Sequence, residues 1–354
     1  MDYLRQTGPS LAVVAAFLML PWHTALNAKE PEPERPVGII FDTDMGNDID
    51  DALALGVLHA LVGRGECQLL AVTSTKDDAD SLPFCDLVNT FYGRGDIPLG
   101  AVRGGKTPDP SKYTRPIVLA QNEGKDRFPR KLRRNQDAPD AVEVLRQTLA
   151  KQPDQSVVIV QVGFSSNLAR LLDSPPDSLA PWNGRELVEK KCRLLSMMAG
   201  WFADDRKKEY NVYIDAPAAR KVFALWPTPI VASGYEIGLA IKYPAQSIEN
   251  DFRYVPHHPI AEAYPFYMKM PYDREAWDLT SALYAVRSNH GYFELSPTGT
   301  ITVDDGDVTQ FTPAPDGKHR YLIASGDQVI RVREALVQLA SQPPCHGEAG
   351  KHGR

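Results

Sequence analysis

Short apolar segments alternate along the chain with segments whose apolar positions recur at helical spacing. The apolar runs have the length of buried parallel strands and lie at residues 37–41, 68–73, 157–162, 194–198 and 229–232. Helical patterns lie at residues 52–62, 81–93, 140–151, 166–173 and 215–225. Alternating strands and helices form βαβ units, so we expect an α/β fold with a mainly parallel open sheet, a Rossmann-like core and helices on both faces.

The last third of the chain has a different pattern. Residues 243–275 are rich in Pro, Tyr and His and are expected to form a long excursion. Two further helices are expected, at residues 278–287 and 327–341. Short apolar segments at 301–303 and 308–311 flank an Asp-Gly pair, which is typical of a hairpin turn. The sequence therefore predicts a small C-terminal β-hairpin in addition to the sheet.

The N-terminal segment has the layout of a secretory signal peptide. Leu11–Leu20 is apolar and is followed by small residues up to Ala28. The run is too short for a membrane-spanning helix, which needs about 20 apolar residues. We expect an exported protein, periplasmic or secreted, with no further membrane association, although an uncleaved anchor stays open. The predicted organisation is a signal peptide at 1–28, a Pro-rich linker at 29–36, one α/β domain at 37–342 and a polar tail at 343–354.

Composition excludes some classes of protein. The 354 residues include 39 Lys and Arg against 45 Asp and Glu, and a net charge of −6 argues against binding nucleic acid through bulk electrostatics. The cysteines form no CxxC pair, so a zinc cluster is not expected. Cys67 and Cys192 adjoin apolar runs and are expected to be buried, and disulfide pairing stays open.

Candidate chemistry is concentrated in residues 42–51, directly after the first strand. This loop carries five carboxylates in ten residues, at Asp42, Asp44, Asp48, Asp50 and Asp51. Carboxylates so close together repel one another. A hard cation such as Ca²⁺, which takes six to eight oxygen ligands, would relieve that repulsion. Ligand sites of open α/β sheets form at strand-end loops, so we expect a metal site here.

Two other motif families fit the loop poorly. An EF-hand needs Gly sixth and Glu twelfth, whereas Gly46 is fifth and Leu53 is twelfth counting from Asp42. Haloacid-dehalogenase-type phosphatases also begin with Asp-x-Asp after a strand. They usually have Thr or Val where this chain has Gly46. A phosphatase with Asp42 as nucleophile is kept as a weaker alternative.

The loop resembles instead the opening of the inosine-uridine-type nucleoside hydrolases, in which DTDxG is followed by DDAxAL. Asp50-Asp51-Ala52 matches that helix start, but the loop has two more residues than the commonest form, so Asp48 and Asp50 compete for one family role. Further segments are similar to the family in the same order, at 162–169, 198–200, 209–212, 215–219 and Asp278. The resemblance covers about residues 37–290 and implies a divergent, exported member.

The resemblance implies a calcium-dependent hydrolase that cleaves the N-glycosidic bond of ribonucleosides or related ribosides, giving base and ribose through a metal-bound water. The implied metal ligands are Asp44, Asp51, Asp278 and a backbone carbonyl near Ser166. Asp44 would also be the general base. The implied substrate-binding residues are Asp50, Asp78, Glu209 and Asn211. The expected partner is a small riboside, and homo-oligomerisation stays open.

One departure from the family leaves the departing base without its usual acid. Trp277 stands where the family often has His, and an indole does not titrate near neutral pH. We expect Trp277 to stack on the base and His258 to replace the missing acid. The same departure motivates an alternative, a riboside-binding protein that keeps the metal site but catalyses weakly.

Overall fold

The strand β1 (Val37–Thr43) lies in the interior of a large sheet, and its side chains are buried from Ile39 onward. The structure is a computed structural model and describes residues 36–345. The predicted signal peptide, nearly all of the linker and most of the tail lie outside the described residues. The residues that the structure describes belong to one unit that begins at Pro36.

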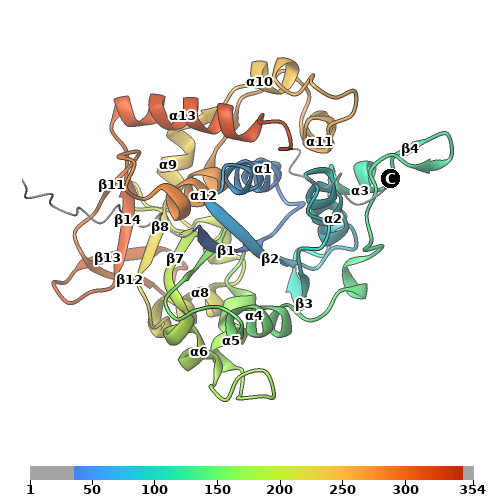
Figure 1. The fold of residues 1–354 in the computed structure, drawn as a ribbon. Helices are drawn as coiled ribbons and strands as arrows, with labels where there is room; N and C mark the ends of the chain where they lie inside the picture. The colour runs from blue at the N-terminus through green and yellow to red at the C-terminus, as the bar shows by residue number, and fades with distance from the viewer. Residues whose placement is uncertain (1–35, 346–354) are drawn as a thin grey trace, which may run out of the picture. The chain divides into compact units, whose positions relative to one another are not determined.

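The main sheet has the strand order β13-β12-β14-β8-β7-β6-β1-β2-β3, and β11 pairs with β14 beside this path (Figure 1). The segment from β3 to β14 is parallel, which confirms the predicted fold class. The predicted hairpin is confirmed as the antiparallel pair β12–β13. The other strands of this sheet are β2 (Cys67–Lys76), β3 (Leu99–Lys106), β6 (Val157–Gln161), β7 (Cys192–Met198), β8 (Ile230–Ser233), β11 (Glu294–Leu295), β12 (Gly299–Val303), β13 (Thr309–Pro313) and β14 (His319–Ile323).

Strand β14 was not predicted from the sequence. It runs parallel to β8 and meets β12 at a single residue pair, Gly299 with His319. The hairpin is therefore joined to the edge of the main sheet rather than standing apart from it. Two side chains of β14 are buried, those of His319 and Leu322. Its sequence therefore lacks the continuous apolar pattern of the inner strands.

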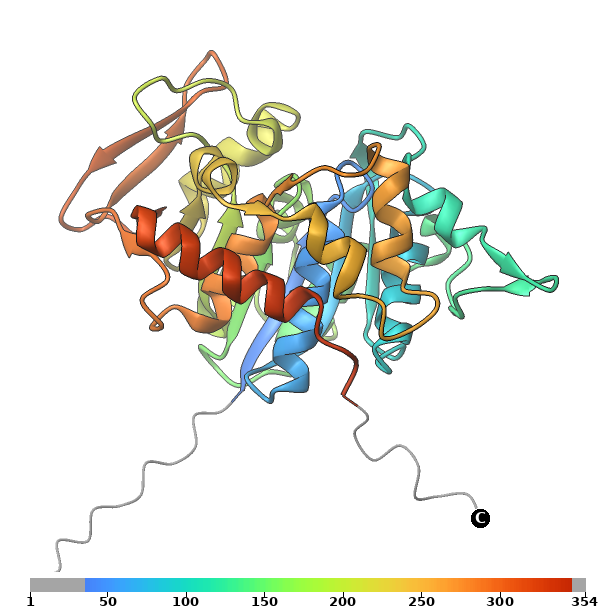
Figure 2. The same ribbon diagram turned by 90° about the horizontal axis from the view of Figure 1, so that it is seen from above.

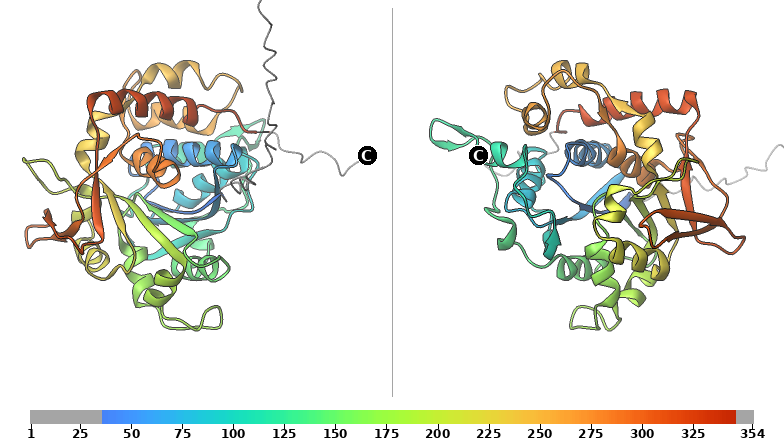
Figure 3. Two further views of the ribbon diagram at one scale, coloured as in Figure 1. Left: turned by 60° about the vertical axis from the view of Figure 1, so that its left-hand side comes forward. Right: turned by 180° about the vertical axis from the view of Figure 1, so that it is seen from behind.

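Helices cover both faces of the sheet, and a separate hydrophobic core lies on each side (Figures 1 and 3). One face carries α1 (Asp50–Gly63), α2 (Ser81–Phe91), α11 (Pro259–Tyr267), α12 (Trp277–Arg287) and α13 (Gly326–Ala340). The other carries α4 (Ala141–Ala150), α5 (Ser166–Asp173), α6 (Gly184–Lys191) and α8 (Ala216–Leu225). Helix α1 is apolar on all sides and buried almost throughout, because α12 and α13 pack over it.

The predicted excursion contains short elements and returns to its starting point. Its two ends pair as an antiparallel ladder, β9 (Lys242–Tyr243) with β10 (Arg274–Glu275) (Figure 2). This pairing places β10 and the start of α12 beside the start of α1. The remaining elements are α3 (Thr114–Val118), β4 (Gln121–Asn122), β5 (Lys125–Asp126), a 3₁₀ turn (Asn135–Asp137), α7 (Tyr210–Tyr213), α9 (Tyr235–Ala240) and α10 (Ala245–Asn250).

Two further observations bear on the sequence analysis. No described helix combines the length and the apolar character needed to cross a membrane. Cys67 and Cys192 are buried as predicted, and within the described residues all four cysteines are unpaired.

A close backbone contact at Gly238 yields a prediction about stability. A Cβ atom added there would lie within 2.5 Å of Trp277 Cα, and backbone cannot rotate away. We expect Gly238→Ala to lower the free energy of unfolding by about 1–3 kcal/mol, measured by urea denaturation. Gly326→Ala is the control, because its Cβ would meet nothing within 4 Å. Equal stability of the two variants would contradict this packing.

Candidate active site

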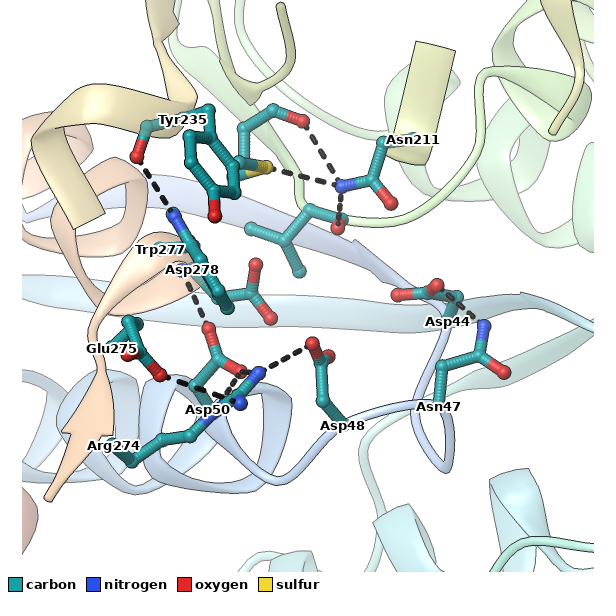
Figure 4. A network of polar contacts seen from close by, with 12 residues as sticks. Asp44, Asn47, Asp48, Asp50, Asn211, Tyr235, Arg274, Glu275, Trp277 and Asp278 are labelled. Atoms are coloured by element: carbon teal, nitrogen blue, oxygen red, sulfur yellow. Dashed lines mark hydrogen bonds and ion pairs between the residues drawn. The ribbon is translucent and has the colours of Figure 1, made fainter. Parts of the chain in front are cut away.

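A cavity of about 420 Å³ lies at the carboxyl ends of β1, β6 and β7. Asp44 follows β1, Val162 follows β6 and Met198 ends β7, so parallel strands bring these residues to one edge of the sheet. The lining residues are Asp44, Asp48, Asp50, Val162, Met198, Trp201, Lys208, Glu209, Tyr210, Asn211, Tyr213, Tyr235, Tyr267, Arg274, Trp277 and Asp278. Figure 4 shows how the polar members converge.

The aspartate loop is held in shape by its own turn and by one tyrosine. Gly46 has a φ of 113°, a conformation that other residues rarely adopt. The Tyr113 hydroxyl accepts from the Gly46 amide at 2.8 Å and donates to the Asp48 carbonyl at 2.6 Å. Met45 and Ile49 are fully buried and anchor the loop to the core. Asp48, the one carboxylate between these two anchors, lines the cavity.

Three carboxylates come close enough to share a metal ion. Asp48, Asp51 and Asp278 each offer an oxygen atom, and these atoms lie within 4.8 Å of one another. Asp51 Oδ2 and Asp278 Oδ2 are buried and have no hydrogen-bond partner among the described residues. Buried polar atoms are normally satisfied, so this pair of oxygen atoms fits a bound cation. An all-oxygen donor set suits a hard cation such as Ca²⁺ or Mg²⁺.

The predicted metal set was Asp44, Asp51 and Asp278. The structure brings Asp51 and Asp278 together, but the third member of their group is Asp48. Asp44 lines the same cavity and accepts a hydrogen bond from Asn47 Nδ2 at 2.6 Å. Asp44 does not belong to this group of three, but it lies close enough to Asp51 for its charge to raise the pKa of Asp51.

Burial disfavours the ionised form of these carboxylates. It raises the pKa of Asp44 to about 6, and the nearby charge of Asp50 adds to the effect. Burial is also the main cause that raises the pKa values of Asp51 and Asp278 well above their usual range, and the neighbouring aspartates raise them further. A bound cation would reverse this tendency, because nearby positive charge favours the ionised form.

Arg274 is a positive side chain that contacts the aspartate loop directly. Its guanidinium forms ion pairs with Asp48 and, at 2.9 Å, with Asp50. It also lies 5.0 Å from the ring centroid of Tyr267 and 4.8 Å from that of Trp277. Arg274 therefore connects the aspartate loop to the aromatic lining of the cavity.

Glu209 and Asn211, two of the predicted substrate-binding residues, both line the cavity. Glu209 is the N-cap of α7, and its carboxylate accepts backbone hydrogen bonds from Gly200, Asn211 and Val212. Asn211 Nδ2 donates to the carbonyl oxygen of Val162 at 2.7 Å. Burial raises the pKa of Glu209 to about 7. The cap at the start of α7 therefore brings both side chains to the cavity.

An aromatic stack forms one wall of the cavity. Tyr235 lies between Trp201, at a centroid distance of 4.2 Å, and Trp277, at 5.2 Å. The Trp277 indole N–H donates to the Tyr235 carbonyl at 2.9 Å and is not free for a ligand. Trp277 thus lines the cavity as predicted, with its only polar atom engaged by the protein.

The structure corrects the prediction for His258, which lies outside the cavity. His258 is 2 % exposed and caps α11, where Nδ1 accepts from the Ile260 amide at 3.2 Å. Its ring packs on Phe91 and Phe252 at centroid distances of 4.5 and 4.7 Å. The adjacent exposed ring, His257, pairs with Glu262. Neither ring is placed to protonate a departing base.

Two other predicted residues also lie away from the cavity lining. Ser166 faces a separate hollow of about 240 Å³, where its hydroxyl donates to Asp215. Val162, directly after β6, lines the cavity, and its carbonyl oxygen accepts a hydrogen bond from Asn211 Nδ2. Asp78 is 4 % exposed beyond the end of β2 and does not belong to the cavity lining.

Asp42 does not present a nucleophile to the cavity. It is fully buried, and Oδ1 accepts hydrogen bonds from Thr73 Oγ1 at 2.5 Å and from Asn167 Nδ2 at 2.8 Å. It ties together the ends of β1, β2 and α5. The phosphatase alternative, which requires an accessible Asp42, has no support.

Sequence reasoning missed Arg274, Tyr235 and the carbonyl of Val162 as parts of the site. Arg274 lies four residues before Asp278, which is a weak signal, because only the pairing of β9 with β10 aims it at the loop. Tyr235 follows β8 directly, and a polar aromatic residue at a strand end could have been noted. A backbone carbonyl carries no sequence signal.

Comparison with known proteins points to one family. Residues 39–320 match the family model described as inosine-uridine preferring nucleoside hydrolase. A pyrimidine-specific ribonucleoside hydrolase RihA from Citrobacter koseri is 30% identical over 265 residues, which cover 69% of this chain and 75% of that protein. The homologue from Salmonella schwarzengrund is 31% identical over 264 residues, with the same coverage.

Solved structures agree in fold. A purine-preferring ribonucleoside hydrolase from Gardnerella vaginalis has a TM-score of 0.64 and 16% identity, covering 88% of this chain and 100% of that one. An inosine-uridine preferring nucleoside hydrolase from Bacillus anthracis has a TM-score of 0.62 and 19% identity, covering 86% and 99%.

The position of His258 predicts a pH dependence of stability. Burial lowers the pKa of His258 from 6.5 to about 3. Between these two pH values the ring is protonated in the unfolded chain but neutral in the folded chain. The contribution of the neutral His258 ring to the free energy of unfolding is complete above about pH 6.5 and is lost as the pH falls toward 3. We expect His258→Asn, which keeps a capping side chain, to remove up to about 1.4 kcal/mol per pH unit of that slope in urea denaturation.

The control for this prediction is His257→Asn, which changes the exposed neighbouring ring. It should leave the acid slope of the wild-type protein unchanged. If His258→Asn shows the wild-type slope as well, the ring is not held neutral by burial.

Proposed function

Because the chain belongs to the inosine-uridine preferring nucleoside hydrolase family, it is an N-ribohydrolase, and we propose that it cleaves ribonucleosides to base and ribose in a Ca²⁺-dependent reaction. The observation that carries this proposal is the convergence of the Asp48, Asp51 and Asp278 carboxylates beside Asp44 at one cavity. Glu209 and Asn211, at the start of α7, line the same cavity.

The metal identity rests on the donor chemistry. Asp48, Asp51 and Asp278 would hold the ion, with the Val162 carbonyl in the same cavity wall. Ca²⁺ accepts irregular arrangements of carboxylates and carbonyls more readily than Mg²⁺, which demands near-octahedral geometry. A bound divalent ion supplies Lewis acidity and lowers the pKa of water.

Asp44 is proposed as the general base. Its carboxylate lines the cavity, and the Asn47 amide holds it in place. Even with its pKa raised to about 6 by burial, Asp44 is mostly ionised at neutral pH and can accept a proton. Asp44 would take the proton from the attacking water as the water oxygen bonds to the ribose carbon, while the N-glycosidic bond breaks and its electron pair leaves with the base.

The ribose is proposed to lie between Glu209 and the aspartate loop. The Glu209 carboxylate oxygens are oriented by three backbone amides and can still accept from sugar hydroxyls. The carboxylates around the ring would stabilise the positive charge that develops on the sugar in the transition state. The base would lie against Tyr235 and Trp277, which form the aromatic wall.

The proposal extends to location. The apolar run Leu11–Leu20 followed by small residues supports export, so we propose that the enzyme meets its ribosides outside the cytoplasm.

The first test is ribose release from a panel of purine and pyrimidine ribonucleosides, since the relatives include enzymes of both preferences. We expect turnover that is abolished by a chelator and restored by Ca²⁺. Turnover that persists in metal-stripped protein would contradict the metal requirement. Calorimetric binding of ribosides with no ribose release would favour the binding-protein alternative.

The second test concerns the general base. We expect Asp44→Asn to lower kcat by about 10²–10⁴-fold while KM changes little, because the proton acceptor is lost but the cavity shape is kept. Asp327→Asn, an exposed carboxylate on α13, is the control. A kcat for Asp44→Asn within a few-fold of the wild type would assign the base to another residue.

A further inference from the structure

Asp48 and Asp50 compete for one role in the aspartate loop, and the structure treats them differently. Both oxygen atoms of Asp50 are engaged by the protein. Oδ1 accepts from Arg274 Nε at 3.1 Å and Nη2 at 2.9 Å, and Oδ2 accepts from the Asp278 amide at 3.2 Å. Asp50 is 1 % exposed. Little accepting capacity is left for a ligand.

Asp48 keeps one oxygen atom free. Its Oδ2 accepts from Arg274 Nη2, whereas Oδ1 has no hydrogen bond among the described residues. Its side chain is 35% exposed, and it belongs to the triad with Asp51 and Asp278. In Figure 4 the Asp48 carboxylate points into the space between Arg274 and Asp44.

Arg274 is held firmly enough to set this difference. Its side chain is 7% exposed, and its backbone pairs with Tyr243 in the β9–β10 ladder. The rings of Tyr267 and Trp277 flank the guanidinium. A planar guanidinium with fixed donors can bind two carboxylates at once and so offset their repulsion.

We propose that Asp48, and not Asp50, is the ligand-facing carboxylate of the loop, and that Asp50 and Arg274 are positioning residues. Arg274 donates two hydrogen bonds to Asp50 Oδ1 and so occupies that oxygen atom. Its hydrogen bond to Asp48 Oδ2 orients the free Oδ1 of Asp48 toward the metal and the ribose. Asp50 also fixes the start of α12, which carries Asp278. This deepens the proposed function and rests on it, and it reverses the role that family resemblance implies for Asp50.

The experiment compares two isosteric variants two residues apart, Asp48→Asn and Asp50→Asn. Calorimetry measures Ca²⁺ binding to the metal-stripped full-length protein. We expect Asp48→Asn to weaken Ca²⁺ binding by about 100-fold or more, as the loss of a ligand. Asp50→Asn should cost about tenfold, as the loss of an outer-shell contact. Equal losses, or a larger loss for Asp50→Asn, would overturn the assignment.

Arg274 is tested through non-additivity. If Asp50 acts through Arg274, the double variant Asp50→Asn with Arg274→Met binds Ca²⁺ no more weakly than Arg274→Met alone. Arg274→Lys should restore part of the affinity, because one cation is kept without the planar fork. Additive losses would show that Asp50 acts only through the Asp278 amide and not through Arg274, which overturns the positioning role of Arg274.

Arg287→Gln is the control for losing a buried arginine pair, because Arg287 binds Glu66 through two hydrogen bonds of 2.7 Å away from the cavity. It should lower the melting temperature and leave Ca²⁺ affinity unchanged. The binding measurements need no turnover. Failure of the wild-type protein to release ribose would therefore refute the proposed reaction while leaving the comparison of Asp48 with Asp50 decidable.

Discussion

Mutual repulsion of carboxylates in a cavity shielded from water is the constraint on which this structure depends. Asp44, Asp48, Asp50, Asp51 and Asp278 all lie at one strand end, and burial is the main cause that raises the pKa values of Asp44, Asp51 and Asp278. Two like charges 4 Å apart repel by about 4 kcal/mol at an effective dielectric constant of 20. The carboxylates can stay ionised together only if positive charge lies close to them. The surrounding structure provides that charge.

The chain supplies part of that charge from distant segments. Arg274 lies at the C-terminal end of the 243–275 excursion and forms ion pairs with two of the carboxylates. Lys76, at the end of β2, lies near Asp44, and its Nζ donates to the carbonyl of Thr107. The oxygen atoms of Asp51 and Asp278 that have no partner are left for a metal ion. The charge balance therefore links the metal site to the pairing of β9 with β10.

The side of the cavity that would receive the base is aromatic and not acidic. Within the described lining there is no histidine, and the indole N–H of Trp277 is bound to Tyr235. Such a wall can hold the flat face of a ring through stacking, and its indole rings do not titrate near neutral pH. Discrimination among bases would then depend on the shape of the wall formed by Trp201, Tyr235 and Trp277.

The sequence by itself determined the architecture and the location of the chemistry. The buried strands and helices have strong local periodicity, and a dense aspartate loop after a strand marks a site whatever surrounds it. Tertiary structure alone decided the division of labour within the site. Whether Asp48 or Asp50 keeps a free oxygen atom depends on the guanidinium of Arg274, which is more than 200 positions away along the chain. Likewise, His258 lies outside the cavity because aromatic rings from other segments enclose it. Local patterns cannot encode such contacts, because a contact between distant segments depends on how the whole chain packs.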